Sequence, residues 1–143
     1  MAETLAGFQE RGAAHRNCAQ SVLYFSLRSL GHDPGSIVAA RYLGGGMVRL
    51  GHLCGVLSGA ALALGFRDMN AEEGEEVDAV AVTAQMQSIV HDFEEEFGAT
   101  DCRTLTGHDL TTRDGYRAFA ASDARPRCAR YVEWACDRVG EII

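Results

Sequence analysis

Cysteine is the residue type whose number and placement could support chemistry in this chain of 143 residues. The sequence has five cysteines, at positions 18, 54, 102, 128 and 136, and no Cys-x-x-Cys pair. That absence removes the thioredoxin-type motif, the usual zinc knuckle and the Cys-x-x-Cys-His motif for haem attachment. Separations of 36, 48 and 26 residues between the first four cysteines are a weak signal for a shared site. By spacing alone, five ordinary buried cysteines are the favoured interpretation.

Other residue types exclude several classes of function. All thirteen basic residues are arginine, which removes the P-loop lysine, the Schiff-base lysine and the Ser-x-x-Lys nucleophile. The net charge of −7 and the lack of a basic stripe argue against nucleic acid as a partner. No Ser/His/Asp order and no His-Glu-x-x-His motif appears. Whether the chain is an enzyme is left open by these patterns.

The length and the apolar content favour one domain, spanning residues 1–143. No basic start followed by an apolar run and a cleavage site is present, so we expect a reducing, cytoplasmic location. The apolar run 53–66 is about 14 residues long, whereas a bilayer takes about 20. We therefore expect a core helix there and no membrane span.

The elements that must position the cysteines have helical periodicity. Apolar residues in the segment 82–97 recur at helical spacing, and Gly98 is placed to end that helix. Asn17 is a candidate N-cap for a helix that reaches Leu30 and ends at Gly31. Further helices are expected over 4–14, from Pro34 to about Leu43, and from about Pro126 onwards. No alternating strand pattern appears, so the fold class expected is all-α.

A glycine-rich helix is expected at the centre of the bundle. From about Met47 the chain is apolar almost all round, and Gly51, Gly55 and Gly59 recur every four residues along one ridge. Each glycine costs roughly 1 kcal/mol of helix propensity relative to alanine, so a close approach by a second helix or a cofactor is expected there. The fold predicted is a compact bundle of five to six helices around this one.

The same elements place the cysteines. Cys18 falls in the first turn of its helix, where free N–H groups favour a thiolate. Cys54 falls beside the glycine ridge, Cys102 in a polar loop over 99–114, and Cys128 near the start of the last helix. Cys136 lies on that same helix, about 12 Å beyond Cys128, which is too far for a disulfide. The acidic connection 70–76 is expected to be a solvated loop and helix start.

Five short motifs together resemble the C_GCAxxG_C_C family of redox-active proteins. They are Asn17-Cys18-Ala19-Gln20, Gly44-Gly45-Gly46-Met47, Cys54-Gly55-Val56-Leu57-Ser58-Gly59, Cys102-Arg103-x-Leu105-x-Gly107 and Cys128. The resemblance spans roughly residues 17–134. Val56 stands where the family has alanine, and Cys136 has no counterpart in the four-cysteine pattern. The chain is also similar to the cluster-binding part of split-Soret cytochromes, although the haem motif is missing and no haem is expected.

The resemblance implies that Cys18, Cys54, Cys102 and Cys128 carry electron or thiol transfer, with an unknown electron or thiol donor or acceptor as partner. Four thiolates suit an iron–sulfur cluster, for which Gly55 and Gly59 would leave room, and nearby Arg49 would support the thiolate charge. Structural zinc on the same four ligands and two dithiol/disulfide couples are the alternatives. Cys136 is predicted to be dispensable.

A rival interpretation from another class is a structural or adaptor protein whose buried cysteines are inert. The glycine ridge also leaves a homodimer open. The interpretations differ in geometry, because a shared site requires that at least three of the four motif cysteines line one pocket next to Gly55. Dispersed cysteines in separate apolar environments would favour the inert interpretation.

Overall fold

The computed structural model describes residues 1–69 and 77–143, and the prediction for the acidic connection 70–76 lies outside this part of the chain. The described residues form helices and no strand, apart from one isolated antiparallel bridge between Leu53 and Asp101. The all-α prediction is confirmed. The described residues contain seven α-helices and two short 3-10 helices, more than the five to six expected: α1 (Ala2–Gln9), η1 (Gly12–Ala14), α2 (Cys18–Leu30), η2 (Pro34–Ala40), α3 (Gly55–Asp68), α4 (Ala79–Phe97), α5 (Cys102–Thr106), α6 (Arg113–Ala121) and α7 (Ala124–Gly140).

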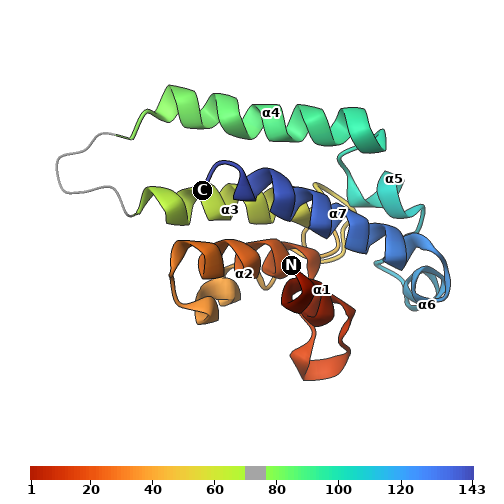
Figure 1. The fold of residues 1–143 in the computed structure, drawn as a ribbon. Helices are drawn as coiled ribbons and strands as arrows, with labels where there is room; N and C mark the ends of the chain where they lie inside the picture. The colour runs from red at the N-terminus through yellow and green to blue at the C-terminus, as the bar shows by residue number, and fades with distance from the viewer. Residues whose placement is uncertain (70–76) are drawn as a thin grey trace.

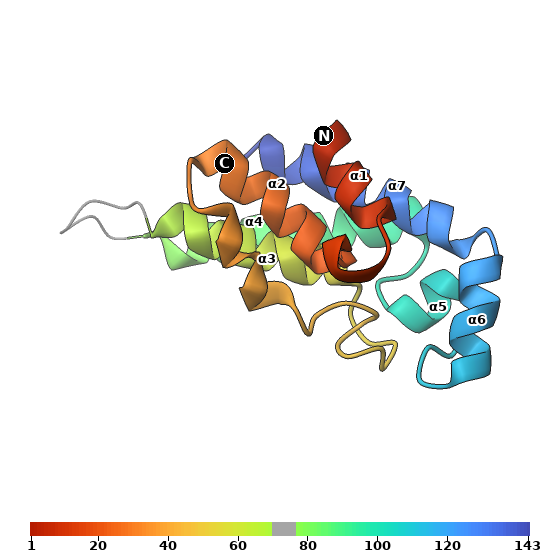
Figure 2. The same cartoon turned by 90° about the horizontal axis from the view of Figure 1, so that it is seen from below.

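The long helices run side by side, and the short ones gather at one end. Helix α3 packs against α2, α7 and α4, while α2 also contacts α7 and α1 (Figure 1). Figure 2 shows the same bundle from below, with α5, α6 and the loop that precedes α3 at the end where α3 begins and α4 ends. That end holds most of the irregular backbone. No helix in the described residues is long and apolar enough to cross a membrane.

The core is formed by the apolar faces of the long helices. Phe93 of α4 is fully buried, and its ring centroid lies 5.6 Å from that of Tyr131 and 5.4 Å from that of Trp134 on α7. These edge-to-face arrangements are the favourable ones for aromatic rings. Ile89 and Phe93 are the buried residues of the α4 stripe, so the periodicity in 82–97 is confirmed as a packing face.

Several helix ends follow their sequence signals. Asn17 and Gln20 form a capping box at the start of α2, and Gly31 ends that helix in the left-handed conformation with φ of 74°. Asp78 caps α4, and Gly98 ends it with φ of 86°. These caps satisfy backbone groups that have no partner inside the helix.

The glycine-rich helix begins at Gly55, so the prediction that it begins near Met47 is wrong. Five consecutive residues, 45–49, have positive φ, and three of them are not glycine: Met47 (68°), Val48 (44°) and Arg49 (66°). Left-handed backbone costs roughly 1–2 kcal/mol for each such residue, so helical periodicity in the sequence could not indicate it. Gly51, with φ of 77°, lies in this loop and not on a helical ridge.

Other boundaries differ for local reasons. The expected helix over 4–14 is interrupted after Gln9, and the segment from Pro34 is a 3-10 helix that ends at Ala40. The polar loop expected over 99–114 contains α5, because the Asp101 side chain accepts a hydrogen bond from the Thr104 N–H at 2.8 Å and caps it. Helix α7 begins at Ala124, two residues before Pro126.

Candidate functional site

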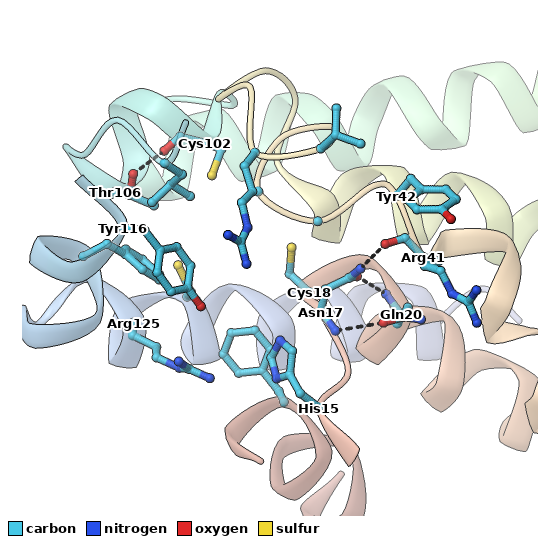
Figure 3. Close-up of a pocket in the computed structure, with 18 residues that line it drawn as sticks. His15, Asn17, Cys18, Gln20, Arg41, Tyr42, Cys102, Thr106, Tyr116 and Arg125 are labelled. Carbon is cyan, nitrogen blue, oxygen red and sulfur yellow. Dashed lines mark hydrogen bonds between the residues drawn. The ribbon is translucent and has the colours of Figure 1, made fainter. Parts of the chain in front are cut away.

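Three of the four motif cysteines line one cavity of about 480 Å³ at the irregular end of the bundle: Cys18, Cys102 and Cys128. Figure 3 shows the sulfur atoms of Cys18 and Cys102 in the space between α2 and α5. The prediction that at least three of the four line one pocket is confirmed. Cys54 does not line the cavity, but it is buried at the N-cap of α3, directly before Gly55.

Cys18 is positioned by the cap of α2. It is the first residue of that helix, directly after the capping residue Asn17. The Asn17 side-chain amide also donates to the Arg41 carbonyl oxygen at 2.9 Å, which ties the chain after η2 to the start of α2 (Figure 3). A Cβ at Gly44 would lie 2.7 Å from the Asn17 Cβ, so only glycine fits this approach. The glycine triplet therefore begins against the residue that caps the Cys18 helix.

Backbone pairing holds Cys54 and Cys102 on adjacent segments. The Cys54 N–H donates to the Thr100 carbonyl at 2.8 Å, and the Cys102 N–H donates to the His52 carbonyl at 2.7 Å. Between them lies the isolated bridge of Leu53 with Asp101. This pairing lies outside any helix, which corrects the expectation that Cys54 lies within a helix and that Cys102 lies in a free loop. Cys54 is an N-cap, and Cys102 is the first residue of α5.

Gly55 and Gly59 allow α2 to approach α3 closely. A Cβ at Gly55 would lie 2.3 Å from the Cys18 sulfur, and one at Gly59 would lie 2.6 Å from the Ala19 carbonyl oxygen. The close approach predicted for these two glycines is therefore that of a second helix, with the Cys18 sulfur directly over Gly55. Gly59 faces the backbone of α2 and not the cavity.

The two cysteines of α7 have different environments. Cys128 reaches the cavity and packs against the cluster of Cys102, Leu110, Phe119 and Ala124. Cys136 is fully buried in the main core and does not line the cavity. Because eight residues of helix separate them, they cannot face the same site.

Burial keeps the cysteines of the cavity protonated in the metal-free protein. It raises the pKa of Cys102 and of Cys128 to about 12, and it raises the pKa of Cys54 well above its usual value. Negative charge on neighbouring cysteines adds to these increases, which shows that the four groups act on one another electrostatically. Burial also raises the pKa of Cys18, but the backbone N–H groups of Gly45, Ala19 and Gly55 oppose that increase.

The charged side chains that line the cavity are all arginine: Arg41, Arg49 and Arg125. Arg49 had been expected near the thiolates because it precedes the glycine-rich helix, and the structure places its guanidinium carbon 4.2 Å from the centroid of the Tyr116 ring. Tyr116, Phe119 and Arg125 were not anticipated from the sequence. Their contact with the cysteines depends on where α6 and α7 pack, and no local motif signals it.

The cavity offers cysteine thiols as ligands for a metal centre. No group of three or more His, Cys, Asp or Glu side chains in residues 1–69 and 77–143 is arranged to hold one metal ion. Three cysteines that line a cavity, with Cys54 close to all three, suit a polynuclear centre, because cysteine thiolates are the usual ligands of iron–sulfur clusters. The Cys18 sulfur, close to several N–H groups, is an environment that stabilises a coordinated thiolate.

Comparison with known proteins identifies a family for the chain. No curated protein and no solved structure matches the chain. One family model, described as a putative redox-active protein (C_GCAxxG_C_C), matches residues 16–142 and so covers most of the chain, including all four motif cysteines. The chain belongs to the C_GCAxxG_C_C family of putative redox-active proteins.

Proposed function

We propose that the protein is an electron-transfer protein that binds an iron–sulfur cluster through Cys18, Cys54, Cys102 and Cys128. The observation that carries the proposal is that three of these cysteines, far apart in sequence, line one cavity. Cys54 is buried close enough to interact electrostatically with all three, whereas Cys136 lies in the main core. Bound there, the cluster would supply a one-electron redox centre. The proposed location is a reducing cytoplasm, where cysteines remain available as ligands.

The acid–base state of the cysteines supports coordination over thiol exchange. Free thiols with pKa values of about 12, such as those of Cys102 and Cys128, are almost entirely protonated near pH 7 and are poor nucleophiles. A metal centre overcomes this protonation, because a coordinating thiol is deprotonated by the metal. The cavity therefore suits metal–thiolate bonds better than a dithiol that must react unaided.

The surrounding chain has two roles in the proposal. The backbone N–H groups near Cys18 would stabilise its thiolate, and hydrogen bonds to ligand sulfurs are a known determinant of cluster potential. Arg49 and Arg125 would offset the negative charge of four thiolates in a partly buried site. Gly55 keeps the α3 backbone clear of the Cys18 sulfur.

Anaerobic reconstitution tests the proposal. Reduced, metal-free protein is incubated with ferrous iron and sulfide, desalted, and analysed for bound iron, bound acid-labile sulfide and visible absorption. We expect each chain to bind more than one iron ion and a nearly equal number of sulfide ions. The visible absorption should decrease on reduction.

The alternatives give different results in the same experiment. Zinc bound in preference to iron, with no sulfide, would indicate a structural metal site. Loss of four thiols on mild oxidation, without metal uptake, would indicate two disulfide couples. Absence of both metal uptake and thiol oxidation would leave the inert, structural interpretation standing. Each of these three outcomes contradicts the cluster proposal.

A further inference from the structure

The charge of the cavity is opposite to that of the protein. The chain carries a net charge of −7, with 20 acidic and 13 basic residues. The cavity is nevertheless lined by three arginines and no aspartate or glutamate. The sequence around it has the same character, because no acidic residue occurs between Asp33 and Asp68. Positive charge alone in the cavity of an acidic protein favours an anionic ligand.

The arginines of the cavity are not used for ion pairs within the described chain. The ion pairs of residues 1–69 and 77–143 involve Arg67, Arg103, Arg127 and Arg138. None of them involves an arginine that lines the cavity. Their guanidinium groups therefore retain donors for a ligand.

Arg49 is held in place in two ways. Its guanidinium lies over the ring of Tyr116, a cation–π arrangement that leaves the N–H groups at its edge available. Its backbone is left-handed, with φ of 66°, and its N–H donates to the Gly44 carbonyl at 3.2 Å. Backbone strain in a non-glycine residue often marks a functional position.

Arg125 supplies the second charge. It extends from the start of α7 on the same side of the cavity as His15 (Figure 3). His15 is neutral near pH 7, because burial lowers its pKa and the charge of Arg125 lowers it further. Its Nδ1 donates to the Glu10 carbonyl oxygen at 3.0 Å. Arg41, by contrast, extends away from the Cys18 sulfur in Figure 3, so we do not assign it a role.

We propose that this cavity binds a small organic anion, with its carboxylate or phosphate on Arg49 and Arg125 and its apolar body against Tyr116 and Phe119. Arginine is suited to both oxyanions because its planar fork donates two parallel hydrogen bonds. The apolar lining, which also includes Leu110, suits a ligand with a hydrophobic body rather than a simple inorganic ion. The role of this ligand beside a redox centre rests on the proposed function, whereas its binding does not.

Calorimetric titration with matched probes tests the proposal. The probes are 2-naphthoate, its neutral analogue 2-naphthamide, and 2-naphthyl phosphate, added to the reduced, metal-free wild type. We expect either anion to bind at least about tenfold more tightly than naphthamide, because hydrogen bonds to charged groups contribute that much or more. The tighter of the two anions identifies the preferred oxyanion. Added salt should weaken the binding of the anions and not that of naphthamide.

Arginine variants locate the binding site. Arg49→Gln and Arg125→Gln should each weaken binding of the preferred anion by about tenfold and leave naphthamide unchanged. Arg117→Gln is the matched control, because Arg117 is exposed on α6 and does not line the cavity. Equal binding of naphthoate and naphthamide, or unchanged anion binding in both cavity variants, would overturn the proposal. Because the titration uses metal-free protein, failed cluster reconstitution would not affect its result.

Discussion

Cys128 and Cys136 lie on one helix, and their surroundings show how differently the two ends of the molecule are built. Around Cys136 the backbone is regular and the side chains of long helices pack into a fully buried core. Around Cys128 the chain consists of short helices, an isolated bridge and a left-handed turn. Regular packing makes the Cys136 thiol inaccessible, whereas irregular backbone brings the other cysteines together from distant parts of the chain.

The irregular end carries a conformational cost that the core must offset. Among the described residues, the non-glycine positions with positive φ are Met47, Val48 and Arg49, all next to the cavity. Their combined cost is of the order of 3–6 kcal/mol. Burying large side chains such as that of Phe93 stabilises the fold by a comparable amount. The comparison indicates that packing of the long helices offsets the backbone strain beside the cavity.

The largest expected effect is the slow alkylation of Cys136 in the folded protein compared with the denatured protein. Burial raises its pKa to about 12, so at pH 8 only about one molecule in 10,000 carries the thiolate. Alkylation of Cys136 by iodoacetamide in the folded, metal-free protein should be at least about 1,000-fold slower than in denatured protein. Mass spectrometry of the peptide that contains Cys136 measures this rate. A rate equal to that of denatured protein would show that Cys136 is not in the core.

Removing the central aromatic ring should test the core end. Phe93→Ala should lower the free energy of unfolding by about 3–5 kcal/mol, because Phe93 is fully buried against Tyr131 and Trp134. Val80→Ala is the control on the same helix, since Val80 is 81% exposed and should change stability by less than about 0.5 kcal/mol. Urea unfolding measures both. Similar values for the two variants would contradict the packing described for α4.

Two glycines of α3 should respond oppositely to alanine. Gly59→Ala should destabilise by about 1–3 kcal/mol, because the new Cβ would lie 2.6 Å from the Ala19 carbonyl oxygen. Gly65→Ala should be neutral or stabilise by up to about 1 kcal/mol, because nothing lies within 4 Å of its Cβ and alanine is the better helix former. Thermal unfolding compares the pair. A harmless Gly59→Ala would argue against the close contact of α2 with α3, and a destabilising Gly65→Ala would contradict the open surroundings of Gly65.

The smallest effect concerns the left-handed turn. Val48→Gly should stabilise the protein by about 1 kcal/mol, because glycine adopts φ of 44° without penalty and the Val48 side chain is 52% exposed. Val38→Gly is the control, since Val38 is similarly exposed in η2 and has no positive φ. Chemical denaturation of both variants measures the difference. Equal loss of stability in the two would remove the evidence for strain at the cavity.

Sequence reasoning predicted the parts of the fold that depend on local signals. The Asn17 cap, the Gly31 and Gly98 ends and the apolar stripe of α4 each follow from neighbouring residues. The course of the chain over 45–54 could not be predicted, because apolar composition is equally compatible with a buried helix. There the left-handed turn and the pairing of His52 and Cys54 with distant residues determine the backbone.

The candidate site, like the fold, could be predicted from the sequence only in part. The four cysteines were identified through their family motifs, and their convergence follows from the approach of α2 to Gly55 and the pairing of 52–54 with 100–102. Tyr116, Arg125 and Phe119 were missed because nothing in their local sequence links them to cysteines. Their position depends on how α6 and α7 pack against the cavity.

The central claim is that four cysteines form one site and the fifth does not belong to it. Five single Cys→Ser variants, each reconstituted anaerobically with iron and sulfide, test it most directly, with bound iron per chain as the readout and circular dichroism as the control for folding. We expect Cys18→Ser, Cys54→Ser, Cys102→Ser and Cys128→Ser to lose most of the bound iron, while Cys136→Ser binds as much iron as the wild type. Folded variants of the four motif cysteines that bind iron as fully as the wild type, or a Cys136→Ser variant that loses it, would contradict the claim.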